Sequence, residues 1–296
     1  MTETALNGPK QLSATPTVRP KRRKRPSISL VQWLTLALVA AFIIVPFYTT
    51  LLGGFKSVGE LRTNPFGLPQ TWDPSNFVGI VMGPSLFRSL GNSLFIALAT
   101  VALSILLASM TAFAFAHIRF FGSKLLMNFL LLGLLFPSAT AILPLFIKMR
   151  DLGLLDKHLG IIVVQVAFSL SFSILLFHNF FKQLPKELVD AARLDNCGYL
   201  RIYWYVTLPL SLPIIATVGV FNFVGSWNSF LLPLIALNSD ANYTWPLGIM
   251  QFQGEHGSDW PKILAYLTLT ILPAVAFFLL AQRYIISGLT GGAVKG

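Results

Sequence analysis

Polar side chains recur at helical spacing inside two long apolar stretches of the chain. One stretch carries them at i, i+4 and i+7, at Asn222, Ser226 and Ser229. The other carries them at i, i+4 and i+8, at Gln165, Ser169 and Ser173. This spacing places each set on one face of a helix. The two sets are candidates for lining a watery path that supplies hydrogen bonds to a polar solute, or for packing helices together, because small polar residues are common between membrane helices.

Groups that carry catalysis or metal binding do not cluster in the sequence. The four histidines are scattered, and Cys197 is the single cysteine, so no intrachain disulfide and no thiolate metal cluster is possible. No G-x-x-x-x-G-K-[ST] phosphate loop occurs, so this chain is not expected to bind ATP. We therefore predict a chain without a catalytic site, cofactor or metal.

The composition predicts a membrane protein. Of 296 residues, 54% are hydrophobic and 11% are charged, whereas soluble domains carry about 25% charged residues. A chain this apolar cannot bury so much surface in a fold that faces water. The net charge of +11 is a feature shared with nucleic-acid-binding proteins. Here the basic residues lie between apolar runs, which favours membrane topology over nucleic-acid binding.

Six apolar segments are long enough to cross roughly 30 Å of hydrocarbon as helices. They span residues 31–52, 90–117, 125–147, 159–181, 209–237 and 263–286. The runs are continuous and long, unlike the short alternating strands of a barrel. Prolines inside them predict kinks; these are Pro46, Pro137, Pro144, Pro233 and Pro273. The expected fold is an all-α membrane protein with six transmembrane helices.

Lys and Arg residues predict the orientation of these segments. If both termini lie in the cytoplasm, 15 of the 22 basic residues fall on that side and 7 on the other, as the positive-inside rule requires. Residues 1–29 would then form a disordered basic tail, whose run 21–25 holds the first helix at the cytoplasmic face and contacts anionic lipid. The apolar run after the tail is too long for a cleavable signal peptide.

The stretch between the fourth and fifth segments, residues 182–208, is called here the docking segment. Its local signals predict a helix starting near Pro185, a sharp turn, and a second short helix; Asn196 and Gly198 both tolerate a left-handed conformation in the turn. A small apolar face is expected from Leu184, Leu188, Ala191 and Ala192. This face either packs along its own domain or docks into a groove on a partner.

The docking segment resembles the EAA loop of ATP-binding-cassette importer permeases, in which E-A-A-x-x-D-G precedes a hydrophobic residue and L-P. Asp190-Ala191-Ala192 matches the triplet, Asp195-Asn196 the D-G pair, and Leu208-Pro209 the L-P. Asp replaces Glu, which keeps the charge on a shorter side chain. Asn replaces Gly, which keeps access to positive φ at some cost in energy. These two departures affect the fine geometry of coupling.

The resemblance extends over most of the chain after residue 29. Asn92-Ser93, Leu152-Gly153-Leu154, Trp227-Asn228 and Leu232-Pro233-Leu234 match further family patterns. The C-terminal stretch 282–296 is similar to that of carbohydrate-importing permeases of the maltose-transporter type.

The resemblance implies a type I importer permease fold for residues 30–287, a coupling helix in the docking segment, and a cytoplasmic tail at 288–296. The partners would be a second, different permease chain, two cytoplasmic ATPase subunits that bind ATP and Mg, and an extracytoplasmic solute-binding protein. The permease would lie in a prokaryotic plasma membrane and pass a sugar or oligosaccharide. The ATPase would contact Glu187, Asp190, Ala191, Ala192, Asp195, Asn196 and Gly198.

Three other functions can be compared with these features of the sequence. A secondary transporter would carry charge inside its helices, and no acidic residue is available there for proton coupling. A permease for another small solute would share every feature above. A passive channel or structural membrane subunit would not need the docking segment.

Overall fold

The computed structural model describes residues 29–254 and 257–290, most of which are helical. The chain divides into two compact units, residues 1–45 and 46–296, which we describe separately. The first unit holds most of α1 (Leu30–Gly53), a helix of 24 residues with mean hydropathy 2.3, long and apolar enough to cross a membrane. The predicted basic run 21–25 lies outside the described residues.

The second unit is built from helices and one short hairpin. In chain order they are α2 (Val58–Thr63), α3 (Ser75–Met82), α4 (Pro84–His117), α5 (Ser123–Leu131), η1 (Leu132–Leu135), η2 (Ser138–Ala141), α6 (Ile142–Asp151), α7 (His158–Phe181), α8 (Lys186–Leu194), α9 (Tyr199–Ile202), η3 (Tyr203–Thr207), α10 (Leu208–Leu210), α11 (Leu212–Trp227), α12 (Leu231–Ala236), η4 (Asp240–Asn242), η5 (Pro246–Phe252), the antiparallel strands β1 (Gln253–Gly254) and β2 (Gly257–Ser258), and α13 (Trp260–Thr290).

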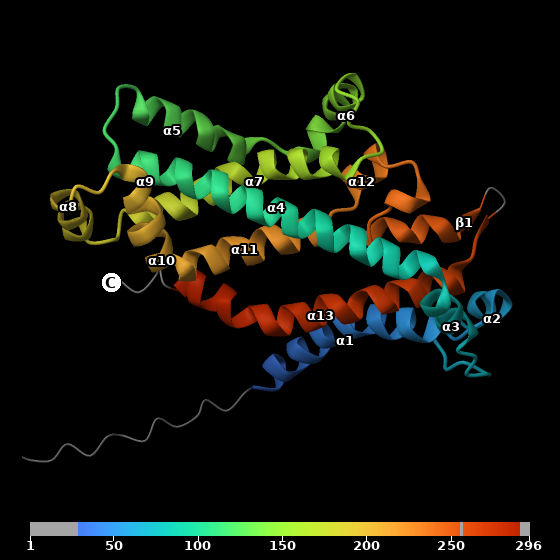
Figure 1. The fold of residues 1–296 in the computed structure, drawn as a ribbon. Helices are drawn as coiled ribbons and strands as arrows, with labels where there is room; N and C mark the ends of the chain where they lie inside the picture. Colours follow the sequence, from blue (N-terminus) through green and yellow to red (C-terminus); the bar gives the residue numbers. More distant parts are fainter. Residues whose placement is uncertain (1–28, 255–256, 291–296) are drawn as a thin grey trace, which may run out of the picture. The chain divides into compact units, whose positions relative to one another are not determined.

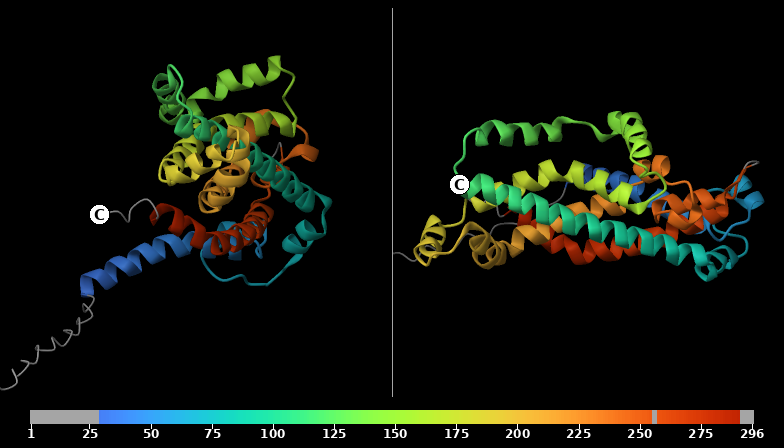
Figure 2. Two further views of the ribbon diagram at one scale, coloured as in Figure 1. Left: turned by 60° about the vertical axis from the view of Figure 1, so that its left-hand side comes forward. Right: turned by 45° about the horizontal axis from the view of Figure 1, so that its top comes forward.

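The long helix α4 is the centre of this unit, packed along α7 and α11 (Figures 1 and 2). Its contact face carries small residues, and Ala97, Ser104, Ala108 and Ala112 are all fully buried. Without large side chains on this face, the backbones of neighbouring helices approach closely, as in many membrane bundles. α4 and α7 are both long and apolar enough to cross a membrane.

The predicted segment 125–147 is not one continuous helix. α5 ends in the two 3-10 turns η1 and η2, and the two halves of the segment meet at 88°. Pro137 explains the break, because it lacks the N–H for a helical hydrogen bond and pushes the preceding residue out of helical geometry. Phe136 is extended accordingly, with φ −92° and ψ 112°. A kink at Pro137 is confirmed, but a single unbroken helix over this segment is wrong.

The predicted segment 209–237 is also broken, at two places. The chain bends by 79° at Ser211, between α10 and α11, and residues 228–230 separate α11 from α12. Pro213 and Pro233 follow these breaks. Each lacks an N–H and crowds the carbonyl four residues earlier, which favours a break there. The effect is not obligatory, because α1 and α13 run on through Pro46 and Pro273.

The described residues hold three helices long and apolar enough to cross a membrane, or up to five spans if each bent pair counts as one. α13 runs through the predicted segment 263–286 and continues to Thr290, beyond the predicted start of the tail at 288. Residues 291–296 lie outside the described residues. The number of six spans stays a prediction.

The second unit has two ends that differ in structure (Figure 1). The α8 end comprises residues 113–123 and 177–206, where α8 and α9 lie beside the last turns of α4 and α7. The β1 end comprises residues 54–93, 152–161 and 236–266, where loops surround the opposite ends of the same helices. An apolar core fills each end, around Phe177 and Phe181 at the α8 end and Ile161 and Leu247 at the β1 end.

Candidate functional site

The docking segment forms the predicted helix, turn and second helix, as α8 and α9. The turn is closed by backbone hydrogen bonds, including one from the Cys197 amide to the Ala192 carbonyl of 3.0 Å. Asn196 takes the left-handed conformation with φ 57°, as its side chain permits. Gly198 does not, because it is extended with φ −70° and ψ 161°. The turn therefore uses only one of its two permissive residues in this way.

The buried face of α8 differs from the predicted one. Val189 is 8% exposed, and it packs with Ala192 on the core of the α8 end. Leu188 is 41% exposed and Ala191 is also exposed, because these residues lie on the other side of the helix. Leu184 precedes the helix, so the predicted spacing through it is not helical. One face of α8 thus packs on its own domain, and the other is left open.

The open face of α8 carries most of the candidate docking residues. Glu187, Asp190, Ala191, Asp195 and Asn196 are all exposed. Gly198 is exposed as well, whereas Ala192 is half-buried. Leu194 lies among them and is 87% exposed. With Lys186 and Arg193 also exposed, the segment presents a mixed charged and apolar surface, which suits a protein partner.

The docking segment is attached firmly to the helices behind it. The Arg193 guanidinium donates a hydrogen bond to the Tyr199 hydroxyl and lies 4.8 Å from the centre of its ring, which joins α8 to α9. Tyr203 follows α9, is 2% exposed, and its hydroxyl lies 2.8 Å from the Ser109 hydroxyl of α4. Packed and hydrogen-bonded side chains therefore connect α8 and α9 to α4.

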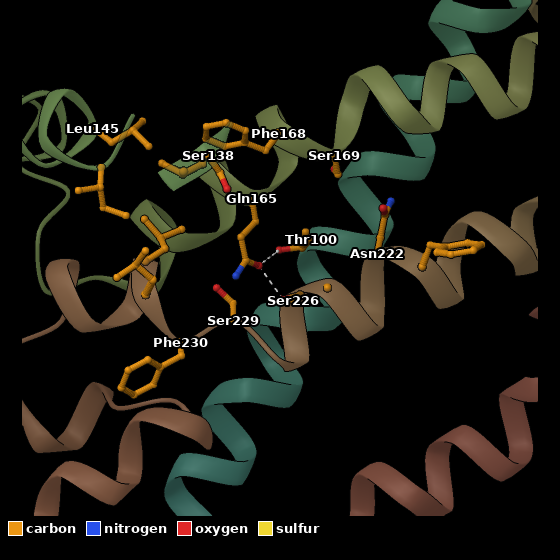
Figure 3. A pocket seen from close by; sticks show the side chains of 16 residues that line it. Thr100, Ser138, Leu145, Gln165, Phe168, Ser169, Asn222, Ser226, Ser229 and Phe230 are labelled. Carbon is orange, nitrogen blue, oxygen red and sulfur yellow. Dashed lines mark hydrogen bonds between the residues drawn. The ribbon is translucent and has the colours of Figure 1, made fainter. Parts of the chain in front are cut away.

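The two polar stripes meet at one pocket of about 430 Å³ (Figure 3). Five of the six candidate path residues line it, namely Gln165, Ser169, Asn222, Ser226 and Ser229. Ser173 does not line it; this residue is fully buried, and its hydroxyl accepts a hydrogen bond of 3.2 Å from Asn222 Nδ2. The pocket lies at the helix breaks, because η2, α6 and residues 229–232 complete its wall.

The same stripes also hold helices together. Gln165 Oε1 accepts a hydrogen bond of 3.2 Å from the Thr100 hydroxyl and one of 2.6 Å from the Ser226 hydroxyl, so it connects α4, α7 and α11. The Ser104 and Ser169 hydroxyls lie 2.7 Å apart and connect α4 to α7. The two interpretations of the stripes are therefore compatible, since one set of side chains packs the helices and lines a cavity.

Several residues of the pocket were missed by reading the sequence. Thr100 of α4 lines the pocket, whereas Ser104, one turn later, is fully buried beside Ser169 and is not among the lining residues. The i, i+4 spacing of the two is the same signal that marked the other two helices. The rings of Phe168, Phe221 and Phe230 also line the pocket. No sequence signal separates these rings from the many other phenylalanines of the chain.

At the β1 end, Asp156 connects two loops that are far apart in the sequence. Its Oδ1 accepts hydrogen bonds of 3.0 Å from the amides of Asn238 and Ser239, and its Oδ2 accepts one from the Ser239 hydroxyl. These bonds, led by those from Ser239, hold the pKa of Asp156 well below its usual range. Asp156 also has φ 56°, a conformation that few non-glycine residues adopt.

Two further side chains order the loops of the β1 end. Lys56 is 1% exposed, and its ammonium group donates to the carbonyls of Asn64 and Gly67 at 2.7 Å and of Pro65 at 3.3 Å. Asn92 donates to the carbonyls of Ala241 and Tyr243, at 2.8 and 3.0 Å. The Asn92-Ser93 pair was noted in the sequence, but Lys56 and Asp156 were missed because their partners lie largely in the backbone.

Comparison with known proteins places the chain in a family. The model of the binding-protein-dependent transport system inner membrane component matches residues 104–290. The diacetylchitobiose uptake system permease NgcG of Streptomyces coelicolor is 33% identical, over 88% of this chain and 87% of that protein. The arabinooligosaccharides transport system permease AraQ of Halalkalibacterium halodurans is also 33% identical, over 93% of this chain and all of that protein.

A solved structure shares the fold. A chain of a bacterial ABC transporter involved in import of the acidic polysaccharide alginate aligns with a TM-score of 0.74 and 22% identity, over 86% of this chain and 95% of that one. The chain therefore belongs to the binding-protein-dependent transport system inner membrane components, and it is a non-catalytic, multi-pass membrane permease subunit of an ABC importer.

Proposed function

We propose that this permease forms half of the translocation path for a sugar or oligosaccharide. The observation that carries the proposal is the pocket of about 430 Å³, where both polar stripes supply hydroxyl and amide groups beside aromatic rings. Sugars present hydroxyls for hydrogen bonding and apolar C–H faces for packing on rings. The two relatives named above, which carry diacetylchitobiose and arabino-oligosaccharides in their names, support the same class of solute.

The docking segment is proposed to transmit the work of ATP hydrolysis. Two cytoplasmic ATPase subunits would bind ATP and Mg, and the open face of α8 would contact one of them. Closing of the ATPase dimer would push α8, and the contact between Tyr203 and Ser109 would carry that push to α4. A helix–turn–helix that moves as one body can switch the pocket between inward-facing and outward-facing states.

The remaining parts of the assembly follow from this role. A second, different permease would complete the path, and an extracytoplasmic binding protein would deliver the solute at the β1 end. The α8 end would then face the cytoplasm with both termini, as the distribution of Lys and Arg predicts. The permease would cross a prokaryotic plasma membrane six times, with the bent segments 125–147 and 209–237 as two of the spans.

The test is reconstitution of the complete importer in lipid vesicles. The chain is co-expressed with a second permease, an ATPase and a solute-binding protein of the same family from its own organism. ATP hydrolysis and uptake are measured with diacetylchitobiose, arabinotriose, maltotriose and an alginate trisaccharide as probes. We expect at least one sugar to raise ATP hydrolysis and to accumulate in the vesicles.

A variant of the docking segment tests coupling in the same assay. The double change Asp190→Lys and Asn196→Pro reverses a charge on the open face and removes the left-handed turn, because proline cannot adopt φ 57°. It should lose ATPase assembly and stimulation. The control Gln253→Ala, an exposed position at the β1 end, should keep both. A double variant that couples like wild type would refute the role of the segment.

Wild-type behaviour separates the alternative functions. Stimulation only by a solute that is not a sugar would indicate a permease for another small molecule. Flux that needs no ATP would indicate a passive channel.

A further inference from the structure

The amide of Gln165 is held in one orientation by its neighbours. Its Oε1 accepts hydrogen bonds from the hydroxyls of Thr100 and Ser226, at 3.2 and 2.6 Å. A carbonyl oxygen has two lone pairs, so these two donors saturate it. The amide nitrogen must then point away from α4 and α11, and Figure 3 shows it directed toward Ser229 in the pocket.

The amide nitrogen of Gln165 has no hydrogen-bond partner among the described residues, although it is buried. Buried polar groups are nearly always paired, and each exception calls for an explanation. This nitrogen lies in the wall of the pocket, beside the break between α11 and α12 at residues 228–230. An acceptor oxygen of a ligand placed in the pocket beside Gln165 would supply the partner that this nitrogen lacks.

The pocket carries no charge of its own. None of its sixteen described lining residues is ionisable. A carboxylate or sulfonate brought into such an apolar site would lose its hydration without gaining a cation. A neutral solute bearing hydroxyl and ether oxygens meets no such penalty, and its oxygens can accept the hydrogen bond that Gln165 offers.

We propose that Gln165 is a specificity-determining hydrogen-bond donor of the path. Its Nε2 donates to an oxygen of a neutral sugar, Thr100 and Ser226 hold its Oε1 as positioning residues, and Phe168, Phe221 and Phe230 pack against the sugar. The pocket thereby favours neutral over acidic sugars. This inference rests on the proposed function, because it assigns a role to one side chain of the proposed path.

The experiment uses the same reconstituted importer. The binding protein is saturated with each probe sugar, so that differences in its affinity for the sugars do not affect the result. Gln165→Leu removes the donating NH2 without bringing a charge into the pocket. Gln165→Met removes both polar atoms at similar size. Ser226→Ala is the matched control, because it removes a positioning hydroxyl and leaves the donor.

We expect uptake of the neutral sugars to fall about tenfold in both Gln165 variants, as the loss of a good hydrogen bond predicts. Ser226→Ala should lower uptake less. Assembly, and the ATP hydrolysis stimulated by the loaded binding protein, should stay near the wild-type level. The ATP consumed per sugar therefore rises, which a folding defect would not produce.

Three outcomes would overturn the inference. Uptake and ATP consumed per sugar unchanged in both Gln165 variants would show that the donor is not used. A parallel fall of assembly and uptake in both variants would make Gln165 a packing residue. Efficient wild-type uptake of the alginate trisaccharide alone would contradict the neutral pocket while leaving sugar import intact. Wild-type failure with every sugar would instead refute the proposed function itself.

Discussion

The two ends of the second unit are held together in different ways. At the α8 end, apolar side chains such as Phe177 and Phe181 are fully buried, and they anchor one face of α8 through Val189. At the β1 end, hydrogen bonds donated by Lys56 and hydrogen bonds accepted by Asp156 order the loops in addition to the apolar core. The polar side chains of the β1 end thus largely form hydrogen bonds within the chain, whereas those on the open face of α8 are exposed.

The difference is sharpest at two residues with positive φ, Asp156 at the β1 end and Asn196 at the α8 end, with φ 56° and 57°. Asp156 is held by three hydrogen bonds from Asn238 and Ser239. Among the described residues, no side-chain hydrogen bond restrains Asn196. The same backbone strain is therefore compensated within the chain at one end, and at the other it is tolerated by the residue type alone.

The largest effect is expected from Phe181→Ala in the core of the α8 end. Removing this fully buried ring should cost about 3–5 kcal/mol, because a cavity remains where the ring packed. Thermal unfolding of the purified importer measures the loss. The control Phe121→Ala changes a fully exposed ring and should leave the unfolding temperature unchanged. Equal effects from both rings would contradict the view that packing holds this end.

Lys56→Met tests the β1 end. It leaves three backbone carbonyls without their buried donor, at a cost of about 1–3 kcal/mol. We expect faster amide hydrogen exchange in residues 57–70, with little change in the docking segment. Lys262→Met serves as the control, since this half-exposed lysine forms only a surface ion pair with Asp259. Unchanged exchange in 57–70 would show that Lys56 does not order the loop.

The same substitution at the two strained residues should have opposite effects. Asp156→Gly relieves positive φ but removes three hydrogen bonds, so it should destabilise the importer by about 1–3 kcal/mol. Asn196→Gly relieves the strain and removes nothing, so it should be neutral or stabilise by less than about 1 kcal/mol. The unfolding temperatures of the two variants test this expectation. An equal drop in both would show that Asp156 and Asn196 are not held in different ways.

The smallest effect concerns pH. Because the folded-state pKa of Asp156 is lowered by its hydrogen bonds, the stability it contributes is fully present above the unfolded pKa of about 4. That contribution is lost only as the pH falls below this value, toward the folded pKa. The protection factors of amides 238–242, which are corrected for the intrinsic pH dependence of exchange, should therefore stay constant between pH 5 and pH 8. If the protection factors did change over this range in wild type but not in Asp156→Asn, the lowered pKa of Asp156 would be contradicted.

Reading the sequence located the apolar segments well but not their breaks. α4 and α7 match the predicted segments 90–117 and 159–181 closely, apart from the earlier start of α4 at Pro84. The segments 125–147 and 209–237 proved to be bent pairs. Pro137 and Pro233 were recognised as kinks, but Pro213 beside the 79° bend was not. The size of a bend depends on which neighbours take up the freed carbonyl, and the sequence does not specify them.

The candidate site divides in the same way. Helical spacing identified the two polar stripes, because spacing is a local property of the chain. It did not identify Thr100 or Phe230, whose place in the pocket depends on how α4 and the α11–α12 break meet α7. The predicted apolar face of α8 is only partly buried for a related reason. Leu184 and Ala192 pack on the core, but Leu188 and Val189 are both apolar, and only packing decides that Val189 is the buried one.

Composition and local backbone preference alone establish that the chain is apolar enough to require lipid, that it carries the docking segment of a permease family, and that Asn196 can form the turn. The contacts of single polar side chains depend on packing instead. Packing saturates the oxygen of Gln165 and leaves its nitrogen without a partner among the described residues, and it brings Asp156 against a loop more than 80 residues away. Hydrogen bonds between segments far apart in the chain leave no periodic trace in the sequence, so their partners appear only when the helices have packed.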